Sequence, residues 1–448
     1  MIPALTASDM GHWVKRKFPS RQTKWYARED SNLHPLRDRN LNPARLPIPP
    51  LARPVSFRKK WPFGQSAFFI VTPMPHQHTA PLVRFLMLNW RDPRNPLAGG
   101  AERVTLAYLR GLVERGHEVT WFANAFPGGA PEEMIDGIRV LREGGKFTAW
   151  MAARKWHSEQ DSFDLVIDQH HGIPWYAPNW CPDKCVAYIH EVLGPIWDAF
   201  YPWPLNAIGR WQERLTLRQY REVPFWTASD YTRELLAEEG VETIVQIPYG
   251  VGTRALEELP EKELDEPLRL ITVSRLAPNK QVDHAVAAVW CLREHYHLEA
   301  TLEIVGQGQC EMEIRQTVKQ LELEGCVTFR GGLNEADKDA ALREAHFLLH
   351  TSVREGWGLN VVEANAMGTP AIVYPSPGLV ESTRHRETGL VADEDSPEGL
   401  AAMIAEVQSH EGAYQDWRQA ARDRSRTFHW DEVLPMACDQ LEVWAMGE

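Results

Sequence analysis

The chain has 448 residues, of which 44% are hydrophobic and 24% are charged, and its formal net charge is −13. This length predicts two or three domains, and the acidic balance argues against a nucleic-acid partner. No apolar run reaches the roughly 20 residues that a membrane-spanning helix needs, and no signal-peptide pattern is present, so we expect a soluble, non-secreted protein.

Residues 1–83 differ from the rest of the chain. They carry 13 Lys and Arg against 4 Asp and Glu, and they lack apolar periodicity. The run "REDSNLHPLRDRNLNPARLPIPP" resembles a translated antisense tRNA gene, which makes Met74 the expected initiator and this segment an extension outside the fold. The alternative is a disordered basic arm that contacts anionic lipid or RNA.

The first folded region is expected over residues 84–256. Short apolar runs alternate with helical patterns that end at glycine, which predicts a parallel sheet covered by helices. The expected strands are 83–90, 117–124, 163–170, 184–191 and 224–229, and the expected helices are 101–116 and 230–240. An aromatic-rich stretch at 197–215 is either a sugar-stacking surface on the acceptor side or ordinary packing.

A charged, proline-punctuated segment, residues 257–268, predicts an interdomain linker. A second alternating series over residues 269–428 predicts a second doubly wound domain, which faces the first across a cleft. Its strands are expected at 269–274, 300–306, 326–331, 347–352, 370–375 and 388–392, and its helices at 281–295, 310–323 and 335–345. Residues 429–448 are expected to form a helix that returns to the first domain.

The stretch "VREGWGLNVVEANAMGTP", residues 353–370, carries the strongest chemical signal. Gly356 and Gly358 let backbone approach a ligand closely, and the helical pattern that follows them directs free amides at an anion such as phosphate. Glu355 precedes this helix, and Glu363 lies roughly 7 Å along its axis. Two carboxylates on either side of an anion site suit the ribose and hexose of a nucleotide sugar.

Together with its surroundings, this stretch resembles the E-x7-E motif of retaining glycosyltransferases of the GT-B fold, in the large glycosyltransferase family four. "VSRLAPNK", "LEIVGQG", "CVTFRGGLNEAD" and "GLVESTRHRETGLVADEDSPEGLA" follow the pattern of that family in order, as does "NPLAGGAERVTLAYLRGLVERGHEVTWFA" in the first half. The family pattern more often has Phe where this chain has Trp357.

The resemblance implies a donor site for a UDP- or GDP-sugar. Arg275 and Lys280 would hold the diphosphate, Glu363 the ribose and Glu355 the hexose. The other implied donor contacts are Gly99, Gly100, Gly331, Gly356, Trp357, Gly358, Leu359 and Asn360.

A histidine at a strand end of the first domain would lie near the reacting sugar. His190 matches the position in the family, and it would act through its imidazole or its backbone carbonyl. His170 and His171, at the end of another expected strand, are the rivals.

Two further patterns are weaker. "VGQGQCE" begins like a dinucleotide fingerprint but has Glu311 where the third glycine belongs. "DED" at 393–395 imitates a metal motif of other transferases, whereas enzymes of this fold generally need no metal, so we expect none.

The six cysteines, of which Cys181 and Cys185 are the closest pair, are expected to be reduced thiols of a cytoplasmic protein.

The resemblance implies a retaining, metal-independent hexosyltransferase whose acceptor is a glycan, a lipid or a small molecule. A lipid acceptor would imply peripheral contact with the inner face of the cell membrane. The alternatives are a nucleotide-sugar epimerase or hydrolase of the same fold, and a non-catalytic sugar-binding subunit. Glycogen and sucrose synthases fit less well because their chains are usually longer.

Overall fold

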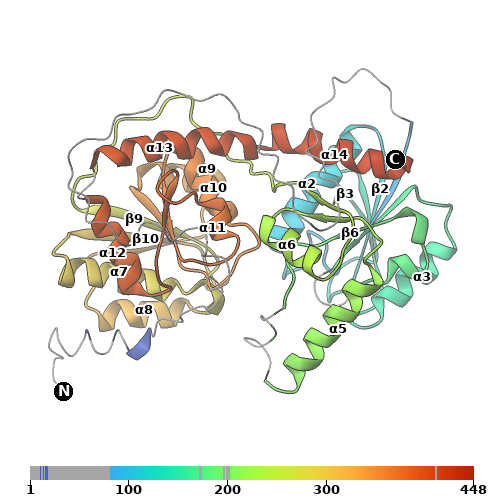
Figure 1. The fold of residues 1–448 in the computed structure, drawn as a ribbon, viewed down its shortest axis with the longest axis horizontal. Coiled ribbons are helices and arrows are strands. Elements are labelled where there is room, and N and C mark those ends of the chain that lie inside the picture. The colour runs from blue at the N-terminus through green and yellow to red at the C-terminus, as the bar shows by residue number, and fades with distance from the viewer. Residues whose placement is uncertain are drawn as a thin grey trace, which may run out of the picture.

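The computed structural model describes residues 11, 14, 16–18, 81–170, 174–194, 197, 202–408 and 411–447. Within these ranges the chain forms two separate β-sheets, each packed with helices, on either side of a cleft (Figure 1). The predicted α/β class with two facing doubly wound units is therefore confirmed. None of the helices in these ranges has the length and apolar character needed to cross a bilayer.

The first sheet has eight strands in the order β3-β4-β2-β1-β5-β6-β7-β8, and every neighbouring pair except β3–β4 is parallel. Its strands are β1 (Arg84–Leu88), β2 (Glu118–Ala123), β3 (Glu132–Ile135), β4 (Ile138–Arg142), β5 (Leu165–Gln169), β6 (Cys185–Tyr188), β7 (Phe225–Thr227) and β8 (Ile244–Gln246). Its helices are α2 (Gly100–Glu114), α3 (Ala149–Ser158), α5 (Leu205–Gln219) and α6 (Asp230–Glu238), with short 3₁₀ turns η2 (Ala177–Asn179) and η3 (Pro182–Lys184).

The second sheet has six strands in the order β11-β10-β9-β12-β13-β14, all parallel. They are β9 (Leu268–Val273), β10 (Ala300–Val305), β11 (Val327–Gly331), β12 (Phe347–His350), β13 (Ala371–Val373) and β14 (Gly389–Val391). The helices are α7 (Val282–His295), α8 (Glu311–Gln320), α9 (Glu335–Glu344), α10 (Leu359–Ala366), α11 (Leu379–Ser382), α12 (Pro397–Gln408) and α13 (Glu411–Ser425), with 3₁₀ turns η4 (Pro278–Lys280) and η5 (Arg426–Phe428).

Both sheets are buried on their two faces, as parallel sheets require. Strand β5 is buried along its whole length, and apolar side chains on either face belong to two different core clusters. Because the strands run parallel, their carboxyl ends gather at one edge of each sheet, and in this molecule the two edges face the same cleft.

The last helix, α14 (Trp430–Met446), packs on α2 of the first half, so the predicted return of the C-terminus is confirmed (Figure 1). The approach is close, because a Cβ at Gly111 would lie 2.9 Å from Cys438 Sγ. Arg115 binds Asp439 at 2.7 Å and Glu442 at 3.0 Å. These contacts fasten the end of the chain to the first sheet.

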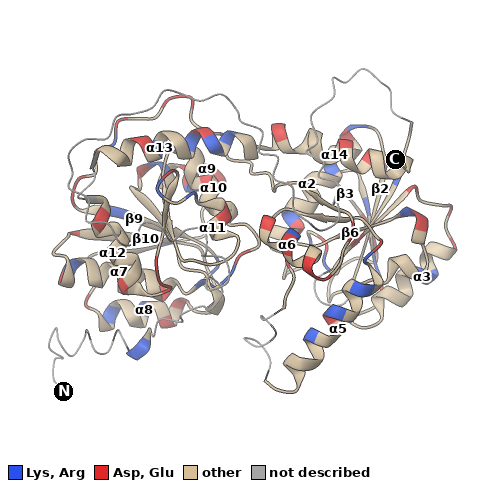
Figure 2. Cartoon of the chain, viewed as in Figure 1, with Lys and Arg blue, Asp and Glu red and all other residues tan. Residues whose placement is uncertain are grey.

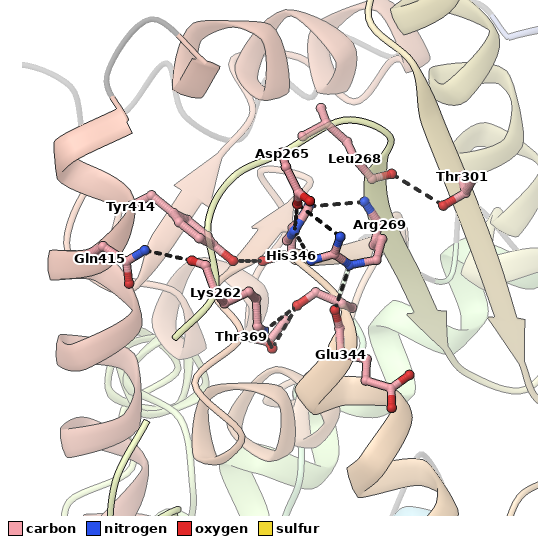
Figure 3. A network of polar contacts seen from close by, with 11 residues as sticks. Lys262, Asp265, Leu268, Arg269, Thr301, Glu344, His346, Thr369, Tyr414 and Gln415 are labelled. Carbon is pink, nitrogen blue, oxygen red and sulfur yellow. Dashed lines mark hydrogen bonds and ion pairs between the residues drawn. The ribbon is translucent and has the colours of Figure 1, made fainter. Parts of the chain in front are cut away.

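The segment predicted as a linker, residues 257–268, contains no helix, and β9 begins at its last residue. The polar network in Figure 3 binds it to the second half. Lys262 Nζ donates to Ala345 O at 2.6 Å and to Thr369 Oγ1 at 3.2 Å, and burial, with nearby arginines, lowers the pKa of Lys262 to about 7. Arg418 and Arg422 of α13 donate to the carbonyls of Pro260 and Leu256.

Most of residues 1–83 lies outside the described ranges, so the interpretation of this segment stays a prediction. Of the described residues before 81, Val14, Lys17 and Phe18 contact the second half. Val14 and Phe18 are buried against the core that includes α7, and Lys17 Nζ donates to Thr317 Oγ1 of α8 at 2.7 Å.

Candidate active site

The cleft between the two sheets has a volume of about 2090 Å³. Strand ends of the first half contribute Gln169 and His190, and strand ends of the second half contribute Val273, Val305 and His350. This arrangement places a single large site at the carboxyl edges of both sheets, which is where open parallel sheets bind ligands.

Helix α10 begins at Leu359, directly after Gly358, as the sequence predicts. Gly358 has φ +80°, and a Cβ there would lie 2.9 Å from Leu379 and Ser382, so the turn into the helix requires glycine. Gly368, with φ +67°, follows the last turn. The N-terminal end of α10 lines the cleft, and its amides give that wall a partial positive charge.

A second helix faces the cleft from the first half. Helix α2 begins at Gly100, and Gly99 is its N-cap, with the Gly99 amide donating to Glu102 Oε2 at 2.6 Å. A Cβ at Gly100 would lie 3.8 Å from Leu359 Cδ1. The two glycine-led helix starts therefore lie close together across the cleft, and both favour an anion between the halves.

Arg275 and Lys280 follow β9 and line the cleft, with Arg275 exposed. Lys280 Nζ forms an ion pair with Glu355. Burial acts to raise the pKa of Glu355, but the Lys280 ammonium beside it outweighs this effect, so this pKa lies below its ordinary value. Burial lowers the pKa of His350 to about 4, so His350 is neutral at pH 7. Glu355 is thus a carboxylate that can only accept hydrogen bonds, and it lines the cleft in the loop between β12 and α10.

Glu363, in the second turn of α10, lines the cleft opposite α9. Its Oε1 lies 3.0 Å from Lys338 Nζ, which also contacts the exposed carboxylate of Glu335. Burial raises the pKa of Glu363, and the neighbouring Lys338 only partly offsets it. The two carboxylates of the motif therefore have different cationic partners, Lys280 for Glu355 and Lys338 for Glu363.

His190 is held by polar partners on both sides of its ring. Its Nδ1 is hydrogen-bonded to Tyr249 Oη, and its Nε2 lies 2.7 Å from Gln169 Nε2. Gln169 Oε1 in turn accepts from Thr105 at 3.0 Å. A Cβ at Gly356 would lie 3.6 Å from the carbonyl oxygen of His190. The structure thus brings His190 against the glycine loop of the second half.

Arg354, directly before Glu355, bridges the two halves. Its Nε lies 2.8 Å from Glu191 Oε2, and its Nη2 donates to Val192 O at 2.5 Å. A second contact also joins the two halves. The carboxylate of Glu381, on α11 of the second half, accepts hydrogen bonds from the amides of Asp230 and Tyr231 at the start of α6 in the first half. The first contact holds the loop after His190 against the loop that carries Glu355, and the second holds α6 against α11.

The other predicted site residues are placed as follows. Trp357 is buried with its ring 5.5 Å from Phe428. Asn360 lines the cleft, but its amide donates to Val273 O at 2.6 Å, so it is turned toward the end of β9. At the end of β11, the described lining includes Gly332 and not the predicted Gly331.

The rival histidines have other surroundings. His170 lines the cleft but is almost fully buried, with Nδ1 3.2 Å from Asp168. That carboxylate also accepts from Tyr220 Oη at 2.6 Å, which suggests a structural role. His171 lies outside the described residues.

The weaker motifs have structural explanations or remain untested. A Cβ at Gly306 would lie 1.9 Å from Ser274 O, and one at Gly308 would lie 2.3 Å from Leu276 O, so these glycines allow two loops to meet. Within the described ranges no three His, Cys, Asp or Glu residues are grouped to hold a metal ion. None of the six cysteines is in a disulfide, in agreement with the predicted reduced thiols.

Sequence analysis missed several residues at the cleft: Gln169 and Tyr249 beside His190, Lys338 beside Glu363, and Arg354. Arg354 adjoins the motif and could have been considered from its position alone. The others come from distant segments, so only the three-dimensional arrangement reveals them.

Two family models match the chain. The one described as Glycosyltransferase Family 4 matches residues 98–254, and the one described as Glycosyl transferases group 1 matches residues 256–424. They meet between the two sheets, so each model covers one half of the molecule.

Similar proteins include a glycogen synthase of Mycobacterium tuberculosis, 24% identical over 407 residues, which are 82% of this chain and 96% of the relative. The length of the chain therefore does not argue against a likeness to glycogen synthases, contrary to the expectation from the sequence. A GDP-mannose-dependent alpha-(1-6)-phosphatidylinositol monomannoside mannosyltransferase of the same species is 32% identical over 232 residues, which are 48% of this chain and 60% of the relative.

Solved structures agree on the fold. A sucrose-phosphate synthase from Thermosynechococcus elongatus has a TM-score of 0.65 at 19% identity, covering 80% of this chain and 98% of that one. Anabaena HepE in complex with UDP-glucose has a TM-score of 0.61 at 16% identity, covering 80% and 99%. Each half of the chain is thus matched by a glycosyltransferase family model, and its two domains have the GT-B fold of the solved structures.

Proposed function

We propose that this protein is a retaining glycosyltransferase that moves a hexose from a UDP- or GDP-sugar to an acceptor hydroxyl without a metal ion. The observation that carries the proposal is the meeting of two helix starts, at Gly100 and Leu359, beside Arg275 and Lys280. Such an arrangement suits a diphosphate, because helix amides and cations both favour negative charge. Among the relatives, a mannosyltransferase named for GDP-mannose and a structure with UDP-glucose support a nucleotide-sugar donor.

In this proposal the diphosphate lies between the start of α10 and the start of α2. Glu363 accepts hydrogen bonds from the ribose hydroxyls, and Glu355 accepts them from the hexose. The loop of Gly356 and Trp357 follows the hexose closely, since glycine leaves room for a ligand. His190 borders the same sugar from the first half.

The proposed reaction exchanges one bond at the anomeric carbon for another. The acceptor oxygen forms its bond on the face from which the diphosphate leaves, and the acceptor proton passes to the departing phosphate oxygen. Arg275, Lys280 and the α10 amides stabilise the charge that grows on that phosphate. Neither glutamate needs to carry a proton, which is consistent with the depressed pKa of Glu355.

A panel of nucleotide sugars tests the donor class. We expect one of them to raise the melting temperature of the full chain, because a ligand that binds only the folded state stabilises it.

With that donor and an acceptor library, NMR should show transfer with the anomeric configuration kept, and EDTA should leave the rate unchanged. Hydrolysis or epimerisation alone would support the alternative enzymes, and the absence of any thermal shift would contradict the proposed donor site. Activity that EDTA abolishes and magnesium restores would overturn the metal-independent mechanism.

Glu363→Ala should raise the donor KM about 10- to 100-fold, because a charge-assisted hydrogen bond is worth about 1.5–3 kcal/mol. We expect kcat to change much less, since the ribose does not react. Steady-state kinetics over a donor series measures both. Glu335→Ala is the control, because Glu335 contacts the same Lys338 ammonium from the exposed side. An equal KM increase in both variants would show that the effect comes through Lys338 and not through the ribose.

A further inference from the structure

Helix α5 and the two residues before it expose large apolar side chains on the surface of the first half. Trp203 is 80% exposed, and Trp211 is 66% exposed. Leu205, Ile208 and Leu215 add exposed fractions of 53%, 56% and 42%. Scattered exposed apolar residues are ordinary, but five on one short segment form a patch that implies a contact.

Arginines accompany this patch. Arg214 and Arg218 are exposed, and at about 100° per residue they lie within the same arc of the helix as Ile208, Trp211 and Leu215. Figure 2 shows the basic bands along α5. Arg214 has a 3.6 Å ion pair with Glu239, which is long enough to be weak. The outward face of α5 is thus apolar and basic together.

The one acidic residue of α5 is turned away from this face. Glu213 is buried, and its carboxylate accepts from the amides of Leu193 and Gly194, both at 2.7 Å. A Cβ at Gly209 would lie 2.3 Å from the ring of Trp197, so the inward face of α5 rests on that ring. Leu193 and Trp197 line the cleft. The exposed face therefore belongs to the helix that supports the first-half wall of the active site.

We propose that Trp203 and α5 dock on the surface of an anionic phospholipid bilayer. Tryptophan and aliphatic side chains enter the headgroup boundary, while arginines reach the lipid phosphates, which is the behaviour of interfacial amphipathic helices. The mixed arc on α5 fits this occupant by charge, because the exposed arginines complement anionic headgroups while the neighbouring tryptophan and aliphatic side chains reach the acyl boundary. Docking on the bilayer requires neither a bound nucleotide sugar nor glycosyl transfer, so it can be tested independently of the proposed reaction. It places the first-half wall of the cleft beside the membrane.

Vesicle sedimentation with the full chain tests the proposal. We expect binding to vesicles of phosphatidylcholine with about 30% phosphatidylglycerol, and much weaker binding to phosphatidylcholine alone. R214E/R218E should weaken binding to the anionic vesicles at least about tenfold, and W203S/W211S should weaken it comparably. All four side chains are exposed, so both variants should keep the melting temperature and the thermal response to donor.

The matched controls are K319E and M312S on α8, which change exposed residues of the same kinds in the second half. They should bind anionic vesicles like the unaltered chain. Every variant keeps the basic residues 1–83, so a loss seen only in the α5 variants assigns the contact to α5. Binding that survives both α5 variants would overturn the proposal, as would no preference for anionic vesicles. So would a lipid-free dimer that the α5 variants convert to a monomer, since α5 would then join two copies.

Discussion

Lys280→Ala should lower kcat about 100- to 1000-fold, the usual effect of removing one group that stabilises charge growing in a transition state. In the proposed reaction that charge appears on the departing phosphate. Lys280 lines the cleft at the end of η4, and it forms an ion pair with Glu355 in the loop that follows β12. The donor KM should change only a fewfold, because the charge on the phosphate is smaller before the bond breaks.

The ion pair with Glu355 complicates this variant, since the carboxylate loses its cation when Lys280 is removed. Glu355→Gln separates the two effects: it removes the ion pair but keeps the ammonium. If Lys280 acts on the phosphate, Glu355→Gln should retain far more kcat than Lys280→Ala, and Lys280→Arg should recover only part of it, because a guanidinium is larger and planar. A wild-type kcat for Lys280→Ala, with donor binding intact, would refute the leaving-group assignment.

Arg142→Met should lower the free energy of unfolding by about 3–5 kcal/mol, the cost of leaving one member of a buried ion pair without its partner. Arg142 Nε donates to Asp92 Oδ2 at 2.7 Å and Nη2 donates to Asp92 Oδ1 at 2.8 Å, and neither side chain is more than 1% exposed. Asp92 also accepts from the Arg94 amide within the loop that leads to Gly99. The variant should therefore lose donor affinity as well as stability, which urea unfolding and donor titration would measure.

The same strand supplies a control. Arg139, also on β4, binds Glu132 at 2.7 Å, but both side chains are about half exposed. Arg139→Met should cost less than about 1 kcal/mol, because water screens such pairs. Asp92→Asn combined with Arg142→Met should regain part of the loss, since no buried charge then remains. Equal unfolding free energies for Arg142→Met and Arg139→Met would contradict the role given to the buried pair.

The sequence is most informative where local chemistry determines the backbone. The glycine before α10 and the glycine after it bound that helix correctly, because both positions have positive φ. The β3–β4 hairpin was missed although it carries a signal: Asp136 and Gly137 both have positive φ, as the two-residue turns of hairpins require. Its strands are short and charged, so apolar alternation did not reveal them.

Helix α5 was missed for the opposite reason. Its exposed face carries Ile208, Trp211 and Leu215, which a periodicity argument assigns to a core. Its buried face carries Gly209 and Glu213, and these fit only because Trp197 and two backbone amides lie beneath them. Burial here depends on a loop elsewhere in the chain, which spacing cannot show.

The site itself was predictable to the extent that it lies in one motif. Gly356 to Glu363 form one loop and one helix, so their order along the chain is also their order in space. The partners of the charged groups were not predictable. Lys338 reaches Glu363 from α9, and Tyr249 reaches His190 after β8, and neither contact leaves a trace in the local sequence.

The attachment of residues 256–262 to α13 has a mechanical consequence. Because Arg418 and Arg422 hold that segment against the second half, the two chain crossings between the halves come together at the Val251–His429 bridge. Trp430 and Gly250 adjoin this bridge, and a Cβ at Gly250 would lie 2.1 Å from the Trp430 ring. Both residues also line the cleft. The crossing between the halves therefore lies at the wall of the cleft, so any change in the angle between the halves would also change the shape of the cleft.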